Sequence, residues 1–152
     1  MENNQPVIIA VDAMGGDHAP DSVIAGIKLA LDNNKADHID VKYLIFGDEE
    51  KVMPLIKKYG ISSDYYSFVH TTGYIASDEK PSVAVRTGRD SSLWKAIESV
   101  KHNEASAIVS SGNTGALMAL SKIILGTMPG IHRPALASIM PNRIGEHVML
   151  DL

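Results

Sequence analysis

Short apolar runs alternate along the chain with segments in which apolar residues recur at helical spacing. The first run, residues 7–11, is continuous and rich in β-branched side chains, which favours a strand buried on both faces of a parallel sheet. The predicted strands cover residues 7–11, 41–46, 66–70, 105–109, 135–140 and 147–152.

The segments between these runs have the apolar spacing of helices. Pro20 and Asp21 mark the start of the first helix, because proline and acidic residues are favoured in a first turn. Asp48 is predicted to cap the second helix, and Gly60 to end it. The predicted helices begin at residue 19 and then cover residues 48–58, 82–102 and 114–125.

This alternation of strands and helices predicts an α/β fold with helices on both faces of the sheet. The last two strands are expected to be joined by a turn at residues 141–143, and the final run, residues 148–152, reads as a core strand. We therefore expect residues 1–152 to be the N-terminal part of a single α/β catalytic domain, with the remainder of the fold outside this chain.

The composition narrows the possible functions. The 152 residues carry 14 Lys and Arg against 18 Asp and Glu, a net charge of −4, which argues against a general nucleic-acid-binding surface. Cysteine is absent, which excludes disulfides, a thiolate metal site and a cysteine nucleophile. No signal peptide and no membrane-spanning stretch is expected. The six histidines show no metal-ligand spacing, so we predict neither a metal site nor a cofactor.

The first candidate group lies where the first strand passes into the first helix. Ligands of open α/β sheets bind at the carboxyl ends of strands, and Asp12, Asp17 and His18 stand together at such an end. Gly15 and Gly16 permit unusual backbone angles or close approach to a ligand. The structural alternative is a tight turn in which Asp17 caps the helix.

The second candidate group, residues 110–116, joins a strand to a helix through small polar residues. Free backbone N–H groups at a helix start make an anion site. Its members are Ser111, Gly112, Asn113, Thr114 and Gly115. The alternative is an N-cap loop with Asn113 or Thr114 as the cap. Ser111 as a nucleophile is disfavoured, because the G-x-S-x-G pattern is missing.

Two further groups are basic. Arg86 and Arg89 are three residues apart and would share a helix face, so that with Lys80 they could hold a phosphate. The alternative is a solvated face paired with nearby acids. Arg133 precedes a proline and is biased towards an extended conformation at a strand entrance. Its alternative role is structural, holding loop carbonyls.

Four stretches in this order resemble the PlsX-type phosphate acyltransferase family of bacterial phospholipid synthesis. The resemblance rests on the sequences IAVDAMGGDHAP at residues 9–20, KPSVAVR at 80–86, SSGNTGA at 110–116 and GIHRPALA at 130–137. Two positions depart from the family pattern, since Arg89 stands where Lys is expected and Ser111 where Ala is expected. Proteins of this family are about twice as long as this chain.

The resemblance implies a Rossmann-like three-layer α/β/α sandwich related to the isocitrate and isopropylmalate dehydrogenases. It implies transfer of a fatty acyl group from acyl carrier protein to inorganic phosphate, giving an acyl phosphate for a membrane glycerol-3-phosphate acyltransferase. A cytoplasmic homodimer, peripheral at the inner membrane face, is expected. The 152-residue chain alone is expected to be inactive.

Phosphate itself is the nucleophile in this reaction, so positioning and charge stabilisation are the main tasks of the protein. We assign phosphate binding to the 112–115 loop with help from Arg86 and Lys80, and proton relay to His18 or Asp17. Arg133 or an amide of Gly15 or Gly16 would stabilise the oxyanion. The catalytic set is thus Asp12, Asp17, His18, Lys80 and Arg133, and the phosphate-binding set is Gly15, Gly16, Arg86, Ser111, Gly112, Asn113, Thr114 and Gly115.

Two other functions fit the pattern. One is a Rossmann-like module that binds a phosphometabolite or nucleotide without catalysis, although no acidic residue follows a glycine fingerprint at dinucleotide spacing. The other is a purely structural half that serves dimerisation.

Overall fold

The computed structural model describes residues 6–37 and 40–150. Strands and helices alternate through the first 124 residues, and a β-hairpin ends the described chain. The elements are β1 Val7–Asp12, α1 Asp21–Asp37, β2 Val41–Gly47, α2 Glu49–Lys58, η1 Ser63–Tyr65, β3 Tyr66–His70, α3 Pro81–Thr87, η2 Gly88–Asp90, α4 Ser92–Lys101, β4 Ala107–Val109, α5 Thr114–Ile124, β5 Ala137–Asn142 and β6 Gly145–Leu150.

Four strands form a parallel sheet in the order β3-β2-β1-β4. The two central strands, β1 and β2, pair along their whole lengths, from Val7 opposite Val41 to Asp12 opposite Phe46. Both strands are apolar without interruption over most of their length, as expected for strands covered on both faces. The predicted parallel sheet is confirmed for these four strands.

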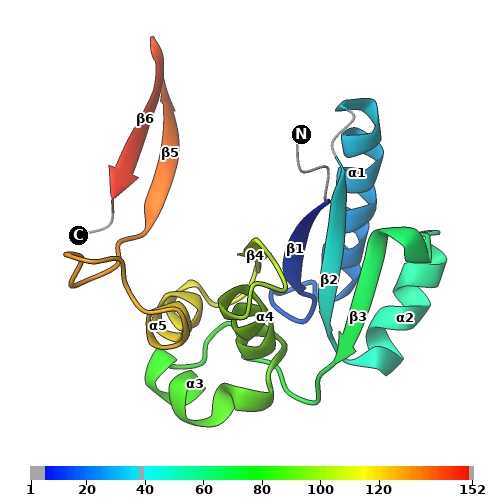
Figure 1. Ribbon diagram of the computed structural model, residues 1–152, viewed down its shortest axis with the longest axis horizontal. Coiled ribbons are helices and arrows are strands. Elements are labelled where there is room, and N and C mark those ends of the chain that lie inside the picture. The colour runs from blue at the N-terminus through cyan, green and yellow to red at the C-terminus, as the bar shows by residue number, and fades with distance from the viewer. Residues whose placement is uncertain (1–5, 38–39, 151–152) are drawn as a thin grey trace.

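Helices cover both faces of the sheet, as predicted (Figure 1). On one face, Val11 and Ile45 are buried against α1 and α2, in a cluster with Ile24. On the other face, Ala10 and Phe46 are buried with Ala96 of α4. Helix α5 packs against α4, and α3 packs against α5. This helix–sheet–helix arrangement is consistent with a Rossmann-like fold.

The helix predicted over residues 82–102 is two helices, which corrects that prediction. Helix α3 ends at Thr87, the 3-10 turn η2 follows, and α4 starts after Ser91. Ser91 caps α4, because its hydroxyl accepts a hydrogen bond from the Trp94 backbone N–H at 3.2 Å. The backbone of Ser91 also bridges to Gly73, so this residue is held in an extended conformation that interrupts helical spacing.

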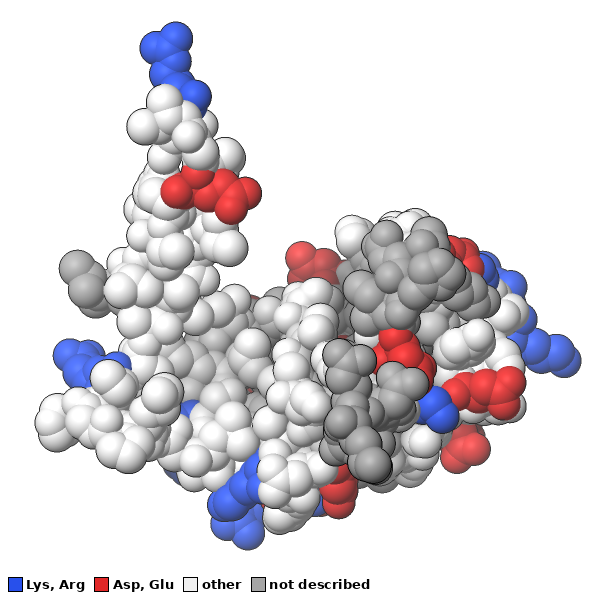
Figure 2. Space-filling model, turned by 45° about the horizontal axis from the view of Figure 1, so that its top comes forward, with Lys and Arg blue, Asp and Glu red and all other residues white. Residues whose placement is uncertain are grey.

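The last two strands do not join the parallel sheet. Strands β5 and β6 pair with each other as an antiparallel hairpin, and the hairpin projects from the body (Figures 1 and 2). Every residue of both strands is exposed, including Ile139 at 68% and Val148 at 64%. The prediction of a core strand was therefore wrong for β6 in this structure. Apolar composition indicates strand formation but does not choose the partner.

None of the helices in the described ranges is both long enough and apolar enough to cross a bilayer.

Candidate functional site

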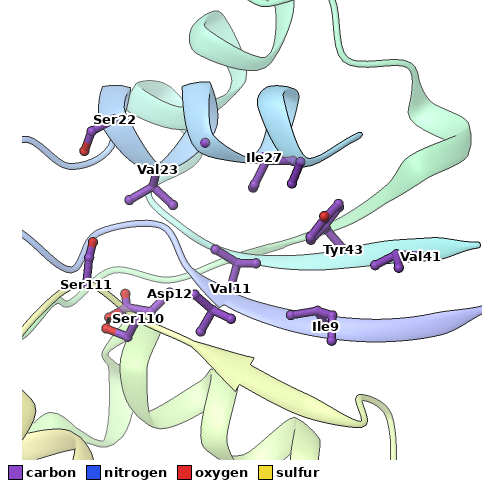
Figure 3. Close-up of a pocket in the computed structure, with 13 residues that line it drawn as sticks. Ile9, Val11, Asp12, Ser22, Val23, Ile27, Val41, Tyr43, Ser110 and Ser111 are labelled. Carbon is purple, nitrogen blue, oxygen red and sulfur yellow. Dashed lines mark hydrogen bonds between the residues drawn. The ribbon is translucent and has the colours of Figure 1, made fainter. Parts of the chain in front are cut away.

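The loops that follow β1 and β4 meet at one edge of the sheet. These strands are neighbours, with Val11 opposite Val109, so the parallel arrangement brings their carboxyl ends together. Figure 3 shows Asp12 from the first loop beside Ser110 and Ser111 from the second. The first and second candidate groups of the sequence are therefore parts of one site, which we call the two-loop junction (residues 12–18 and 110–115).

Glycines let the two loops approach each other closely. A Cβ atom at Gly15 would lie 2.7 Å from the Ser110 hydroxyl and 3.1 Å from the Gly112 nitrogen, both too short for an unstrained contact. Gly16 has a φ of +112°, in the region that favours glycine. The Ser111 hydroxyl donates a hydrogen bond to the Gly15 carbonyl at 2.8 Å. These contacts explain why small residues occupy both loops.

Asp12 turns into the interior. Its side chain is 3% exposed and accepts hydrogen bonds from the hydroxyls of Ser92, at 2.6 Å, and Ser110, at 2.7 Å. The Met14 backbone N–H donates to the same carboxylate at 3.2 Å. Asp12 thus faces α4 and the interior of the junction, and it forms no ion pair with any residue in the described ranges.

Asn113 is the N-cap of α5, the first of the two caps that the sequence left open. Its side-chain oxygen accepts a hydrogen bond from the Ala116 N–H at 2.9 Å. Its side-chain amide donates to the carbonyls of Ser77, at 3.0 Å, and Glu79, at 2.8 Å. The sequence placed Asn113 in the phosphate-binding set, and its side-chain amide is engaged by these carbonyls, so that it ties α5 to the loop before α3.

Two backbone amides of the junction are free hydrogen-bond donors. The Gly112 N–H donates to the Ser110 hydroxyl at 3.2 Å, and the Ala116 N–H is capped by Asn113. The N–H groups of Thr114 and Gly115, in the first turn of α5, have no acceptor within the described chain. They lie at the positive end of the helix dipole, which favours a bound anion.

Asp17 and His18 are exposed at the rim of the junction. The Ser77 hydroxyl donates to the Asp17 carboxylate at 3.0 Å, so Asp17 joins the first loop to the segment that Asn113 also holds. The His18 carbonyl accepts a hydrogen bond from the Ser22 N–H. Asp17 therefore contacts the loop before α3, and His18 stands at the entrance to α1.

The start of α1 is fixed to the end of α2 by a surface cluster. The Lys58 ammonium donates to the Asp21 carboxylate at 2.8 Å, and the Tyr59 hydroxyl donates at 3.0 Å. The hydrogen bond from Lys58 is the main reason that the pKa of Asp21 lies below its ordinary value. Both charged groups are exposed, so the pair positions the helix more than it stabilises the protein.

The basic residues are only partly brought to the junction. Lys80 is the N-cap of α3, and a Cβ at Gly115 would lie 3.0 Å from Pro81, so the starts of α3 and α5 touch. Arg86 lies exposed in the last turn of α3. Arg89 does not share its face, because Arg89 lies in η2 and stacks over the Trp94 ring at 5.8 Å. The prediction that Arg86 and Arg89 share a helix face was therefore wrong.

Arg133 lies in the segment between α5 and β5, which Figure 1 shows leading to the hairpin. Its side chain is exposed, and no described hydrogen bond or ion pair joins it to the two-loop junction. The structure thus unites the first two candidate groups and places Lys80 near them, while Arg133 remains apart. On the face seen in Figure 2, the Lys and Arg side chains form separate groups rather than one basic patch.

A groove of about 540 Å³ runs from the junction along α1 (Figure 3). Asp12, Ser110 and Ser111 form its polar end, and most of its wall is apolar. The catalytic and phosphate-binding sets assigned from the sequence leave out Ser22, which lines the groove, and Ser92 and Ser110, which hold Asp12, although Ser110 begins the second candidate group. Adjacency to the glycine-rich loop could have indicated Ser110, whereas no local signal marks Ser92.

No cluster of three or more His, Asp or Glu side chains able to hold a metal occurs in residues 6–37 and 40–150. The site is instead a junction of two glycine-containing loops, with unpaired amides at a helix start. Fold and site together define an α/β protein with two glycine-containing loops and a helix N-terminus at the carboxyl edge of its sheet, the edge at which ligands of such sheets bind.

The chain belongs to the family described as "Fatty acid synthesis protein", whose sequence profile matches residues 7–152. It is 51% identical over 146 residues to a protein of Rhodospirillum rubrum named "Phosphate acyltransferase", covering 96% of this chain and 41% of that protein. A protein of the same name from Rhodospirillum centenum is 52% identical over 95% of this chain and 39% of its own length. Another from Wolbachia pipientis is 47% identical over 98% of this chain and 43% of its own length. The resemblance stated from the four motifs is confirmed, and the chain spans about two fifths of the length of these relatives.

Proposed function

We propose that the protein to which this chain contributes transfers a fatty acyl group from acyl carrier protein to inorganic phosphate. The product, an acyl phosphate, would serve phospholipid synthesis. The names of the relatives support acyl transfer to phosphate. The observation in this chain that carries the proposal is the pair of unpaired amides, Thr114 and Gly115, at the two-loop junction.

In the proposed reaction, a phosphate oxygen attacks the thioester carbonyl carbon. A carbon–oxygen bond forms, the carbon–sulfur bond breaks, and the carrier thiolate leaves and takes up a proton. No side chain has to act as a nucleophile in this step. The protein must hold the phosphate and stabilise the tetrahedral oxyanion, tasks to which fixed backbone donors are suited.

The amides of Thr114 and Gly115 would bind phosphate, with the positive charge of Lys80 at the neighbouring start of α3 and of Arg86 further along α3. Asp17 and His18, exposed at the rim of the junction, are the candidates for moving the proton, because histidine exchanges protons near neutral pH. We assign stabilisation of the oxyanion to an amide of Gly15 or Gly16 in preference to Arg133, because the two glycines belong to the two-loop junction. Asp12 would act by holding the loops.

The wider expectations are part of this proposal. The partners would be acyl carrier protein, inorganic phosphate and a membrane glycerol-3-phosphate acyltransferase that consumes the product. The intact protein would be a cytoplasmic homodimer, peripheral at the inner membrane face, with a fold like that of the isocitrate and isopropylmalate dehydrogenases.

The test is formation of acyl phosphate from acyl carrier protein thioester and phosphate by the intact protein, trapped with hydroxylamine as the hydroxamate. Asn113→Ala should raise the KM for phosphate, because it frees the start of α5 from the loop before α3. Asn142→Ala, the same change in the hairpin turn, serves as the control. Saturation by phosphate that is the same in Asn113→Ala as in the unaltered protein would remove the loop from the site. Phosphate binding without turnover in the unaltered protein would favour the non-catalytic binding module.

A further inference from the structure

The carboxylate of Asp12 connects three segments that are far apart in the sequence. Ser92, the first residue of α4, donates to one carboxylate oxygen at 2.6 Å, and the Met14 N–H donates to the same oxygen at 3.2 Å. Ser110, at the end of β4, donates to the other oxygen at 2.7 Å. Ser92 and Asp12 are both almost fully buried, at 1% and 3% exposure.

A buried carboxylate is stable only when donors satisfy it. Asp12 has no cationic partner among the described residues, so its donors are the two serine hydroxyls and one amide. Because Ser92 is the first residue of α4, it also places the positive end of that helix dipole beside the Asp12 carboxylate. Removing the Ser92 hydroxyl therefore takes the shortest of three hydrogen bonds from this carboxylate and leaves it with the Met14 amide and the Ser110 hydroxyl as donors.

The same carboxylate fixes the loop that carries the unpaired amides. Because the Ser110 hydroxyl gives its hydrogen to Asp12, its lone pair faces the Gly112 N–H, which donates to it at 3.2 Å. Gly112 precedes the first turn of α5 and lies against Gly15. A continuous chain of hydrogen bonds thus runs from Ser92 through Asp12 and Ser110 to Gly112.

We propose that Ser92 and Ser110 are positioning residues that set the phosphate-binding loop through the Asp12 carboxylate. This inference rests on the proposed function, since it assigns these serines to the same site. Neither side chain has to touch the substrate. Their effect would be to keep the amides at the start of α5 at a fixed place relative to the loop after β1.

The chain offers a matched control in the same helix. Ser99 of α4 is also buried, at 2% exposure, and its hydroxyl donates to the Ala96 carbonyl of its own helix at 2.8 Å. Ser92→Ala and Ser99→Ala each delete one buried hydroxyl, so both are expected to lower the thermal midpoint. Only Ser92→Ala is expected to raise the KM for phosphate, by about tenfold. Ser92→Thr keeps the hydroxyl, so its KM for phosphate should lie close to that of the unaltered protein.

The measurement is made on the intact protein, by acyl phosphate formation and by the rise in melting temperature that inorganic phosphate produces. An equal KM for phosphate in Ser92→Ala and Ser99→Ala overturns the inference. If Ser92→Ala does not fold, Ser110→Ala, at a less buried position, must show the same rise in KM, and a normal KM there overturns it. If the unaltered protein binds phosphate but forms no acyl phosphate, the proposed function fails, while the melting shifts still decide the role of Ser92.

Discussion

Replacing Thr114 with proline removes one hydrogen-bond donor from the two-loop junction without removing the helix. Thr114 is the first residue of α5, the position at which proline is best tolerated, because the N–H there has no intrahelical partner. Asn113 has φ −72° and ψ 107°, an extended conformation compatible with a following proline. The bond from the Leu117 N–H to the Asn113 carbonyl and the Asn113 cap do not involve the Thr114 nitrogen.

Thr114→Pro is therefore expected to weaken the binding of phosphate and to leave the folding of the protein unchanged. A hydrogen bond to a charged group contributes about 1.5–3 kcal/mol, so loss of the Thr114 donor should raise the KM for phosphate by about tenfold to a hundredfold. The thermal midpoint without phosphate should change little. Thr114→Ala keeps the N–H and removes only side-chain atoms, the hydroxyl and the γ-methyl, and its KM for phosphate should stay close to that of the unaltered protein.

The assay is the phosphate dependence of acyl phosphate formation by the intact protein, at a saturating concentration of the acyl donor. Circular dichroism would establish that α5 is retained in the proline variant. If Thr114→Pro folds normally and shares its KM for phosphate with Thr114→Ala, the amide of residue 114 does not bind the anion. The assignment of the phosphate site to the start of α5 would then be refuted.

Two further predictions concern loop contact and pH. Gly15→Ala places a methyl group in the crowded contact between the two loops, so it should lower both the thermal midpoint and the affinity for phosphate. The control is Gly26→Ala, whose added methyl group meets no atom within 4 Å and should preserve both quantities. Equal melting curves for the two variants would contradict this prediction. Burial alone would raise the pKa of Glu98, but hydrogen bonds from the Trp94 indole and the Lys95 ammonium outweigh it and hold the pKa below 4.5. This stabilisation is present above pH 4.5 and is lost as the pH falls through the lowered pKa. Chemical denaturation across that pH range should show a smaller loss of the free energy of unfolding in Glu98→Gln than in the unaltered protein. Parallel plots of this free energy against pH for the two proteins would contradict the prediction.

The parallel sheet could be predicted because its signals are local. The β-branched run at residues 7–11 and the apolar run at residues 41–46 read as buried strands before any partner is known. The break at Ser91 was missed, because the apolar spacing continues across it and the capping geometry depends on a bridge to Gly73. The placement of the hairpin was missed for a related reason, since pairing partners are set by tertiary contacts.

The candidate site likewise has parts that could be predicted from local sequence signals and parts that depend on tertiary contacts. Gly15, Gly16 and the 110–115 loop carry their own backbone signals, so their place at strand ends could be predicted from the sequence. The bond between Ser92 and Asp12 joins residues 80 positions apart, and it exists only because α4 crosses the sheet beside β1. The proposed roles of Asp17, His18 and Arg86 stay predictions.

The distribution of donors at the two-loop junction reconciles a buried carboxylate with an anion site only a few residues away. Asp12 accepts hydrogen bonds from three donors, so its charge is already stabilised by the protein before any anion binds at the start of α5. The Gly112 amide and the Asn113 side chain are engaged by protein acceptors. The amides of Thr114 and Gly115 in the first turn of α5 have no acceptor within the described chain, and the helix dipole there favours an anion. An anion bound there would thus meet donors that have no competing partner, while the donors that shape the loop are already satisfied.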